Sequence, residues 1–452
     1  MSNNLSVLNK KLQKLNGKNI ALLGFGLDNQ ALLTLLDDAN IKGKLTICDF
    51  RPKNKLSLPR LKNIKINYQL QESFNKNLYK FDLLFRSPGW PLSCPGVKEA
   101  ESKKLTEISS PLNLFFSLCP TKNIIGVTGS KGKGTTASLI YQILYDANKT
   151  RANKQVWLGG NIGISPLSFL KEIKSSDFVV LELSSFQLED LKYSPRYSVI
   201  TNLFKEHLAA ADPNNPNFHS SYNTYWQSKL NIAKHHQNKY IIINVRLKNK
   251  IRLATLQNKI HYFSSSSLPS KLIGDYNKEN IGAAELTAKL LKIAPQKYRQ
   301  TIANFHNLEH RLEFVIYKNG VNYFDNSFST TPESTILDLK SFKGPIILIA
   351  GGADKGANFK QLSKNIKAKV KFLVLLKGLG TIRIKKELLN IKFSPQKISE
   401  VSDMKKAISE ARSQAKPGDT ILLSTACASF GLFKNYKERG DLFQKYAKAE
   451  IR

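Results

Sequence analysis

The sequence predicts an α/β protein in which parallel sheets are covered by helices. Short apolar segments that end in glycines are followed by segments with helical spacing, as at residues 18–38 and 123–147. This alternation is typical of βαβ units, whose consecutive strands run parallel. The chain has 452 residues, and at about 150 residues per domain this length predicts roughly three domains.

Each third of the chain contains its own series of apolar strands. The first third predicts an N-terminal helix, strands at residues 18–26, 44–50 and 81–89, and a helix at 31–38. The middle third predicts a strand, a glycine-rich turn and a helix at 123–147, strands at 177–186, 197–204 and 239–245, a loop at 261–270 and a helix at 274–294. The last third predicts strands at 320–326, 344–352, 371–378 and 419–426. We therefore predict domain boundaries near residues 115 and 306.

The composition suggests two explanations for a strongly basic chain. Lys and Arg number 69 against 34 Asp and Glu, which gives a formal net charge of +35. Such a charge could allow the protein to bind nucleic acid or a membrane surface, because phosphate contacts need basic side chains. The lysines, however, are spread along the chain between Asn and Ile, with no block of five or more basic residues. This pattern favours a solvated lysine-rich surface.

Other features of the composition narrow the class of protein. Hydrophobic residues make up 41% of the chain, enough for globular cores. No apolar run approaches the roughly 20 residues of a membrane span, and the first residues lack the apolar core of a secretory signal. The four cysteines are isolated, so we expect a reducing cytoplasm rather than a disulfide scaffold or a zinc site. They are Cys48, Cys94, Cys119 and Cys427.

The turn after the strand at residues 124–127 has the composition of a phosphate-binding loop. It reads T-G-S-K-G-K-G-T-T and precedes a predicted helix. Glycines allow backbone N–H groups to converge on phosphate oxygens, and Lys133 can reach the terminal phosphates. Val127 stands where the general pattern has its first glycine, and Gly134 replaces the hydroxyl residue that would contact Mg²⁺. Thr135 is the nearest hydroxyl. A flexible turn is the alternative, but the glycines and two lysines favour nucleotide binding.

A second glycine turn carries a weaker signal. Gly24 and Gly26 follow the first strand, and Asp49 and Arg51 lie at the end of the next strand. In dinucleotide-binding folds, an acidic residue in that position forms a hydrogen bond with the ribose. The third glycine of that pattern is missing, so an ordinary tight turn is an equal alternative.

Seven motifs follow one another along the chain: the phosphate loop at 126–136, G-G-N-I-G at 159–163, L-E-L-S-S-F-Q-L-E at 181–189, T-N-L-F-K-E-H-L at 201–208, Y-W-Q-S-K at 225–229, H-R at 310–311 and S-T-A-C-A-S-F at 424–430. In their order and spacing the chain resembles, over all three domains, the Mur ligases, the ATP-dependent amino-acid ligases of peptidoglycan synthesis. The last motif, with Lys434-Asn435-Tyr436 and Arg439-Gly440 after it, resembles the branch that adds D-glutamate.

The resemblance implies three domains and one reaction. Residues 1–115 would form a Rossmann-like domain for a UDP-linked substrate, residues 116–306 a P-loop ATPase-type domain for ATP, and residues 307–452 a Rossmann-like domain for the amino acid. ATP would phosphorylate the carboxylate of UDP-N-acetylmuramoyl-L-alanine. The amine of D-glutamate would then attack the acyl phosphate and release phosphate. Groups carried by three domains imply closure around the substrates.

The resemblance also assigns residues to ATP and to two Mg²⁺ ions. Lys133, His207, Lys229 and Asn161 would act in catalysis. Glu182 and Thr135 would hold one ion, while His207 and Lys229 would hold the other, with Lys229 carbamylated because a protonated amine cannot bind metal. The residues expected at ATP are Ser130, Lys131, Gly132, Lys133, Gly134, Thr135, Thr136, Asn280, Arg311, Asp325 and Asn326.

Two further sets of residues follow from the same resemblance. Those expected at the UDP-linked substrate are Gly26, Leu27, Asp28, Asn29, Asp49, Arg51, Ser87, Pro88, Gly89 and Asn161. Those expected at glutamate are Lys355, Ser429, Phe430 and Tyr436.

Several positions depart from the family pattern. Besides Gly134, Glu206 replaces an aspartate and Tyr276 replaces a histidine. Asp325-Asn326-Ser327-Phe328-Ser329-Thr330 stands where the family has N-D-S-K-A-T, so acid and amide are exchanged and Phe328 replaces a lysine. Either Asp325 or Asn326 could contact the ribose, and another nearby cation could replace the lysine.

Three alternatives stay open at this point. A sister ligase or a folylpolyglutamate-type enzyme would add a different amino acid. A basic nucleic-acid-binding ATPase is suggested only by the net charge. An inactive homologue is suggested by Gly134 and Phe328. We expect a cytoplasmic monomer that acts on small molecules, without a nucleic-acid partner or a membrane span.

Overall fold

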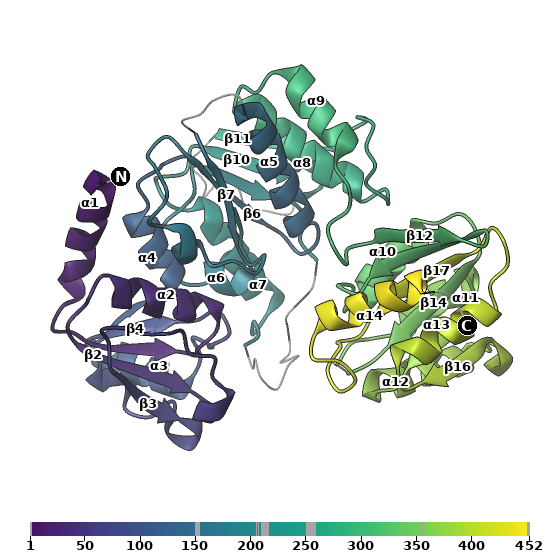
Figure 1. Cartoon of the computed structure of the whole chain (residues 1–452), viewed down its shortest axis with the longest axis horizontal. Coiled ribbons are helices and arrows are strands. Elements are labelled where there is room, and N and C mark those ends of the chain that lie inside the picture. Colours follow the sequence, from purple (N-terminus) through teal and green to yellow (C-terminus); the bar gives the residue numbers. More distant parts are fainter. Residues whose placement is uncertain are drawn as a thin grey trace. The chain divides into compact units, whose positions relative to one another are not determined.

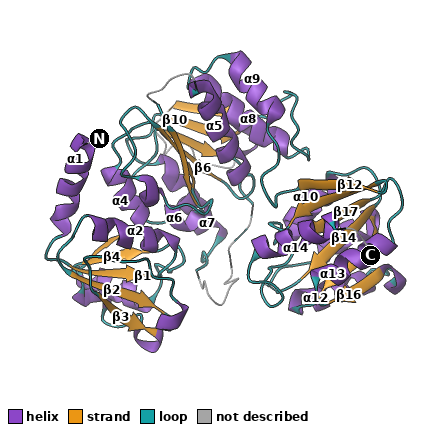
Figure 2. Cartoon of the chain, viewed as in Figure 1, coloured by secondary structure: helices purple, strands orange, loops and turns teal. Residues whose placement is uncertain are grey.

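The computed structural model describes residues 2–149, 154–204, 206, 208, 217–249, 259–354 and 356–449. The predicted fold class is confirmed, because three largely parallel sheets are covered by helices (Figures 1 and 2). The chain divides into two compact units, one comprising residues 1–268 and 279–302 and the other residues 269–278 and 303–452. The first two sheets belong to the first unit, so the predicted boundary near residue 115 stays a prediction.

The first sheet has five parallel strands in the order β3-β2-β1-β4-β5. Its central strands are continuously apolar because helices cover the sheet. The strand order changes direction between β1 and β4, and in open α/β sheets such a point forms a crevice at the carboxyl ends of the strands. The elements are β1 Asn19–Leu23, β2 Lys44–Asp49, β3 Ile66–Leu70, β4 Leu83–Arg86 and β5 Glu107–Ser109, with α1 Ser2–Leu12, α2 Leu27–Asp38 and α3 Pro95–Lys103.

The second sheet has six parallel strands in the order β11-β10-β9-β6-β8-β7. Since β6 lies between β8 and β9, the loops that follow these three strands meet at one edge. The elements are α4 Pro111–Leu118, β6 Ile124–Thr128, α5 Lys133–Asn148, β7 Val156–Gly160, β8 Phe178–Glu182, α6 Ser185–Leu188, β9 Tyr197–Ile200, α7 Tyr222–Leu230, β10 Tyr240–Asn244, β11 Lys259–Phe263, α8 Asn277–Leu290 and α9 Pro295–Asn304.

The third sheet has the order β12-β13-β17-β14-β15-β16. Only β12 runs antiparallel, in a hairpin with β13, and the other pairs are parallel. The elements are β12 Glu313–Lys318, β13 Val321–Asn326, α10 Pro332–Lys340, β14 Ile346–Gly351, α11 Lys360–Lys369, β15 Val370–Leu376, α12 Leu379–Asn390, β16 Ile398–Val401, α13 Met404–Ser413, β17 Thr420–Ser424 and α14 Tyr436–Lys448.

One hydrophobic core joins the first two sheets. It runs from α2 and the first sheet through α4 to the second sheet. The ring of Phe115 on α4 packs edge-on against Phe169, with centroids 6.4 Å apart. Phe169 is the last residue of a short 3₁₀ turn. The 3₁₀ turns of the described residues are Gln13–Leu15, Lys53–Lys55, Gln71–Ser73, Leu78–Lys80, Pro166–Phe169, Asn231–Ala233, Val245–Leu247 and Pro395–Lys397. This shared core explains why the two sheets belong to one unit.

Two expectations about local structure need correction. The predicted loop at residues 261–270 is wrong at its start, because His261–Phe263 end the edge strand β11. The polar serines that follow obscured a strand of only five residues. The helix expected at 274–294 is shorter, spanning Asn277–Leu290, because it ends before the turn at Lys292, which has φ of +55°.

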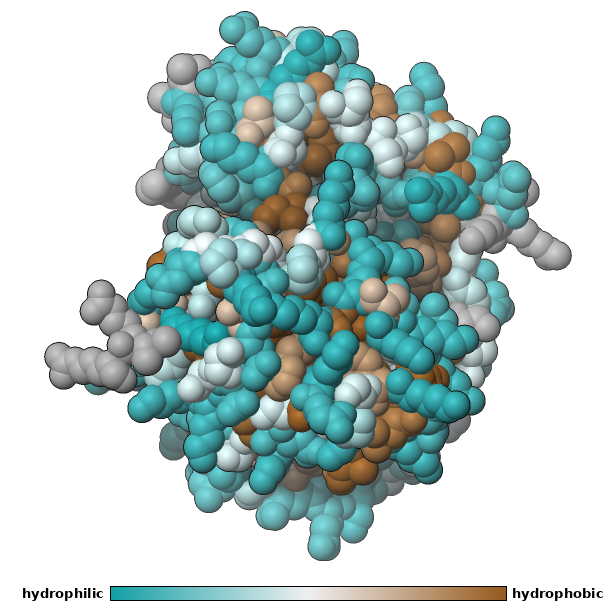
Figure 3. Space-filling view, turned by 90° about the vertical axis from the view of Figure 1, so that its right-hand side faces the viewer, coloured by the Kyte–Doolittle hydropathy of each residue, from teal (hydrophilic) through white to brown (hydrophobic). Residues whose placement is uncertain are grey.

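The surface is mainly hydrophilic on the face that Figure 3 presents. Among the residues that the structure describes, Lys229 is the one fully buried lysine. The same residues include no helix long and apolar enough to cross a membrane.

Candidate active site

The loop between β6 and α5 is held in a conformation that requires glycine. Gly129 has φ of +146° and Gly132 has φ of +79°. A Cβ on Gly132 would lie 2.0 Å from Oδ1 of Asn280, so that residue packs directly on the loop. Because the loop opens a helix of 16 residues, its N–H groups and the helix dipole favour bound phosphate.

The segment after β9 fixes the shape of this loop. The side chain of Asn202 accepts a hydrogen bond from the Lys131 N–H (2.7 Å) and donates one to the Lys131 carbonyl (2.9 Å). The hydroxyl of Thr201 donates to the same carbonyl at 2.7 Å. The T-N pair of the sequence motif therefore supports the phosphate loop from the neighbouring strand.

The polar side chains of the loop have different surroundings. Nζ of Lys133 donates to the carbonyl of Ser130 at 2.9 Å, so it curls over the loop. Lys131 forms an ion pair with Glu206 at 2.6 Å. Thr135 is half-buried, whereas Thr136 is fully buried and its hydroxyl donates to Asn280 at 3.3 Å.

A buried carboxylate lies at the end of the adjacent strand β8. Glu182 is 1% exposed, and its Oε1 accepts a hydrogen bond from Nδ2 of Asn161 at 3.0 Å. The backbone N–H of Asn161 also donates to the carbonyl of Glu182. The second carboxylate oxygen, Oε2, is buried and accepts no hydrogen bond from the described residues. A buried carboxylate oxygen without a donor suits a cation.

Lys229 lies on α7 beside the same loop. It is 2% exposed, and its Nζ donates to the carbonyl of Gly129 at 2.8 Å. Burial, followed by the positive charge of Lys133, lowers the pKa of Lys229 well below its ordinary value. The lowered pKa favours the uncharged amine more than at the exposed lysines of the surface. His207, predicted beside it, lies outside the described residues.

A cavity of about 840 Å³ opens at the crevice predicted for the first sheet. It extends from the turn after β1 to the residues after β7. Of the residues predicted at the UDP-linked substrate, the lining includes Gly26, Leu27, Asp28, Asp49, Arg51, Ser87, Pro88, Gly89 and Asn161. Side chains that the sequence analysis missed are also there, among them Phe50, Phe74, Trp90, Ile164, Gln187 and Phe218.

One predicted residue, Asn29, does not line the cavity. Its side chain is buried and donates hydrogen bonds to the carbonyls of Leu23, Gly24 and Phe85. Asn29 therefore ties the turn after β1 to the end of β4 through hydrogen bonds to buried backbone carbonyls.

Asp49 and Arg51 form a pair at the rim of the cavity. Asp49 accepts hydrogen bonds from Nε and Nη2 of Arg51, each at 2.8 Å, and from the Phe25 N–H at 2.7 Å. Although burial opposes it, these bonds hold the pKa of Asp49 below its ordinary value. Asp49 therefore positions Arg51, whose side chain is 34% exposed and can contact a ligand.

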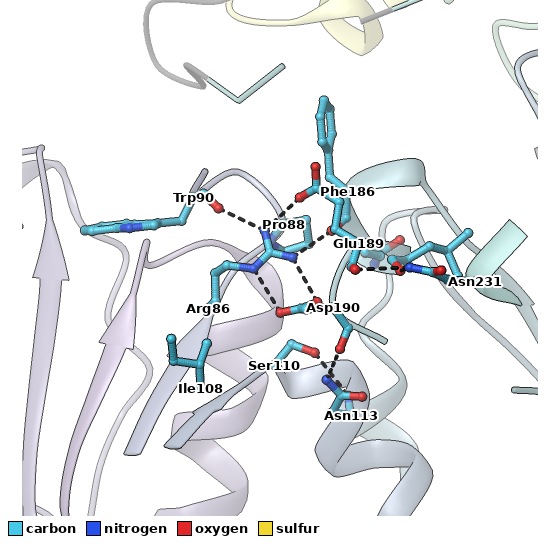
Figure 4. A network of polar contacts seen from close by, with 12 residues as sticks. Arg86, Pro88, Trp90, Ile108, Ser110, Asn113, Phe186, Glu189, Asp190 and Asn231 are labelled. Atoms are coloured by element: carbon cyan, nitrogen blue, oxygen red, sulfur yellow. Dashed lines mark hydrogen bonds and ion pairs between the residues drawn. The ribbon is translucent and has the colours of Figure 1, made fainter. Parts of the chain in front are cut away.

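A buried arginine connects the first sheet to the second. Arg86, at the end of β4, is 1% exposed and pairs with Asp190 at 2.9 Å and Glu189 at 3.4 Å (Figure 4). It also donates to the carbonyls of Trp90 and Phe186, each at 2.9 Å. Burial raises the pKa of Glu189 to about 7, although Arg86 opposes this shift. This network holds the cavity wall at residues 87–91 against α6.

Replacing Arg86 by methionine is expected to lower the free energy of unfolding by about 3–5 kcal/mol. The reason is that the carboxylates of Glu189 and Asp190 would lose their cation while staying largely buried. Urea unfolding followed by fluorescence measures the loss. The matched control is Arg246→Met, because Arg246 is 75% exposed and its ion pair with Glu279 should be worth less than about 1 kcal/mol. Equal losses in both variants would contradict the prediction.

In the second unit, the exchanged pair at the end of β13 lies in the interior. Asp325 is fully buried and accepts hydrogen bonds from His310 Nδ1 at 2.7 Å and from the Ser327 N–H at 2.8 Å. Asn326 donates to the buried Asp338 at 2.8 Å. Both side chains are thus engaged within the protein, and contact of either one with ATP stays a prediction.

Arg311 and Phe328 stack on each other in the same unit. The Cζ atom of Arg311 lies 3.6 Å from the centroid of the Phe328 ring. The edge of Tyr436 packs on that ring, with centroids 5.1 Å apart. The cation near the position of the missing lysine is therefore an arginine from the H-R motif.

The residues predicted at glutamate are only partly described. Ser429 is buried and Phe430 is 41% exposed, while Lys355 lies outside the described residues. Arg439, which follows Tyr436 on α14, is fully buried and donates to the hydroxyl and carbonyl of Ser327. It thereby fixes the loop after β13 against α14.

A glycine-dependent loop at the start of a helix, with a buried carboxylate on the next strand, defines a nucleotide-binding α/β protein. Residues 127–281 match the Mur ligase middle domain, and residues 310–427 match the Mur ligase glutamate ligase domain. The chain is 34% identical to the UDP-N-acetylmuramoylalanine--D-glutamate ligase of Acetivibrio thermocellus, over 97% of this chain and 98% of that protein. It is 33% identical to the enzyme of that name from Clostridium tetani, over 94% and 96%. The chain therefore belongs to the Mur ligase family, as the motifs predicted.

Solved structures share the fold at low sequence identity. UDP-N-acetylmuramate-alanine ligase from Thermotoga maritima matches with a TM-score of 0.57 at 14% identity, covering 95% of this chain and 99% of that one. A bifunctional folylpolyglutamate synthase/dihydrofolate synthase from Yersinia pestis matches with a TM-score of 0.53 at 13% identity, covering 73% and 90%. These likenesses establish a common architecture.

Proposed function

We propose that this chain is the ATP-dependent ligase that adds D-glutamate to UDP-N-acetylmuramoyl-L-alanine in peptidoglycan precursor synthesis. The observation that carries the proposal is the similarity, over nearly the whole chain, to relatives named UDP-N-acetylmuramoylalanine--D-glutamate ligase. We further propose a cytoplasmic monomer whose substrates are small molecules. The net charge of +35 would attract these substrates, because ATP, the UDP-linked sugar and glutamate are all anions.

The proposed reaction has two balanced steps. A carboxylate oxygen of the substrate attacks the γ-phosphorus of ATP, the bond to the β–γ bridging oxygen breaks, and ADP leaves. The neutral amine of glutamate then attacks the acyl carbon, phosphate leaves with the C–O electron pair, and the nitrogen loses a proton. Both steps need positioning and neutralisation of charge more than covalent help from the protein.

The residues around the phosphate loop suit the first step. The N–H groups at the start of α5 and the ammonium of Lys133 would neutralise the charge that develops on the phosphates. The hydrogen bonds of Thr201 and Asn202 to the backbone of Lys131 hold the phosphate loop in one conformation, so little reorganisation is needed when ATP binds.

The donor set near the loop fits Mg²⁺, which the Mur ligases use with ATP. Glu182 offers a buried oxygen without a hydrogen-bond donor, and Thr135 offers a half-buried hydroxyl. The ion would neutralise phosphate charge. We propose a second ion at His207 and Lys229. In its uncharged form, which the lowered pKa favours, the amine of Lys229 can add carbon dioxide by forming an N–C bond and losing a proton, which creates the carboxylate that a metal requires.

The cavity beside the first sheet suits the UDP-linked substrate. It lies at the carboxyl ends of β1 and β4, where α/β sheets bind nucleotides. We assign Arg51, held by Asp49, to the uracil end and Asn161 to the muramoyl part. Because Asn161 also donates to Glu182, the substrate carboxylate would be delivered beside the carboxylate assigned to the metal. Ser429, Phe430, Tyr436 and Lys355 stay assigned to glutamate.

A phosphate-release assay with a panel of amino acids tests the proposal. Purified protein with ATP, Mg²⁺, UDP-N-acetylmuramoyl-L-alanine and D-glutamate is expected to release phosphate, and omission of any one component should abolish release. L-glutamate, L-lysine and diaminopimelate serve as alternative amino acids, and dihydropteroate with L-glutamate tests a folate substrate. Release with another amino acid but not D-glutamate would support a sister ligase. Release stimulated by nucleic acid alone would instead support the nucleic-acid ATPase, and no release at all would contradict the proposal.

A further inference from the structure

The side chain of Arg311 is held on one face and open at its edges. Its Cζ lies over the Phe328 ring, 3.6 Å from the ring centroid. No acceptor among the described residues takes a hydrogen bond or an ion pair from this side chain, although the residue is half-buried. Arg51 and Arg86, in contrast, are paired with carboxylates. A guanidinium with free N–H edges can take an oxyanion.

The residues on both sides of Arg311 have a strained backbone, which fixes the direction in which the Arg311 side chain leaves the turn. His310 has φ of +58° and Leu312 has φ of +54°, so both neighbours are left-handed. This conformation is uncommon for residues other than glycine, and a bulky residue such as leucine rarely adopts it. Strain of this kind persists only where the surroundings hold it, and it is concentrated at functional sites. The Asp325 carboxylate anchors His310, while Leu312 is fully buried.

Phe328 is joined to the same turn. Its backbone N–H donates to the carbonyl of His310 at 3.1 Å, so the loop after β13 and the turn at Arg311 move together. The ring is 38% exposed and contacts both the Arg311 guanidinium and the ring of Tyr436. It occupies the position at which the Mur ligase motif has a lysine.

We propose that Phe328 is a positioning residue that holds Arg311 so that its N–H edges bind an oxyanion of a substrate. The oxyanion is a phosphate oxygen of ATP or a carboxylate oxygen of glutamate, and this inference rests on the proposed function. A planar guanidinium can stack on an aromatic face and still present its fork of donors, which an ammonium cannot do. Where the family has a lysine in the loop after β13, this chain has Phe328, and the cation is instead Arg311 in the neighbouring turn.

Steady-state kinetics of two Phe328 variants test the inference. Phe328→Leu keeps an apolar side chain but removes the π face, and Phe328→Tyr keeps the face. We expect Phe328→Leu to raise the KM of either ATP or D-glutamate roughly three- to thirtyfold, the range that loss of a cation–π contact allows. The kcat should change less than the KM, and Phe328→Tyr should restore both values. The substrate whose KM rises identifies the source of the oxyanion.

Matched controls separate this effect from folding and from failure of the proposed function. Phe314→Leu removes an exposed ring, 50% exposed, that packs on Phe324 and carries no guanidinium, and it should leave both KM values unchanged. Calorimetric titration of ATP and D-glutamate into each full-length variant gives the same comparison without turnover. An inactive wild type would contradict the proposed function alone, because the titration would still report on Phe328. Wild-type binding and KM in Phe328→Leu, or equal defects in the leucine and tyrosine variants, would overturn the inference.

Discussion

The Lys133→Ala variant is expected to lose glutamate-dependent phosphate release by about a thousandfold or more in kcat. Lys133 is the first residue of α5, and its ammonium lies over the loop that would hold the phosphates. Removing this charge takes away a cation beside the proposed phosphate site. Phosphate release at saturating substrate concentrations measures the loss in kcat.

The control for this variant comes from the other end of the same helix. Lys149, the C-cap of α5, is exposed and pairs with Asp146 at 2.9 Å. Lys149→Ala should keep wild-type kcat and should unfold at nearly the same temperature as Lys133→Ala. Wild-type turnover in Lys133→Ala would show that the phosphates bind elsewhere.

The Glu182→Gln variant is expected to lose between a hundredfold and ten thousandfold in kcat. Glutamine keeps the shape of the side chain and an oxygen that can accept the bond from Asn161. It removes the negative charge from Oε2, the buried oxygen without a hydrogen-bond donor. Phosphate release measured over a range of Mg²⁺ concentrations should show a higher Mg²⁺ requirement as well as a lower maximal rate.

Stability distinguishes a metal ligand from a structural carboxylate. A buried carboxylate charge with one oxygen unpaired costs folding free energy, so replacing it by a neutral amide should not lower the unfolding temperature. Glu172→Gln, at an exposed position of the same unit, serves as the control and should keep full activity. An unfolding temperature well below that of the wild type, with an unchanged Mg²⁺ requirement, would assign Glu182 a structural role instead.

The strands that the sequence predicted share one property. All of them lie inside their sheets, while the strands that were missed or assigned to a loop lie at the edges: β3, β5, β7, β11, β12 and β16. An interior strand is covered on both faces and therefore appears as a continuous apolar run, as in the I-I-L-I-A segment of β14. The edge strand β11 instead mixes exposed, half-buried and buried residues without a regular period, and this pattern resembles that of a loop.

The site could be predicted only where its residues follow one another in the sequence. The phosphate loop is contiguous, so its glycines and lysines are visible as a motif. The stack of Arg311 on Phe328 joins residues 17 positions apart along the chain, and nothing in either residue alone indicates the other. Asn29 shows the reverse situation, because its place in a motif predicted a ligand contact while its amide donates to three backbone carbonyls, so its contact with a substrate stays a prediction.

The buried ion pairs of Arg86 have a consequence for attempts to divide the chain into fragments. A piece that ends near residue 115 would keep Arg86 but lose Glu189 and Asp190, and it would expose the apolar side chains of Leu112 and Phe115. Such a fragment should be poorly soluble, and the two sheets should melt in a single transition. The first sheet is consequently not an interchangeable module, and a chimaera with another ligase would need both sides of this junction from one parent.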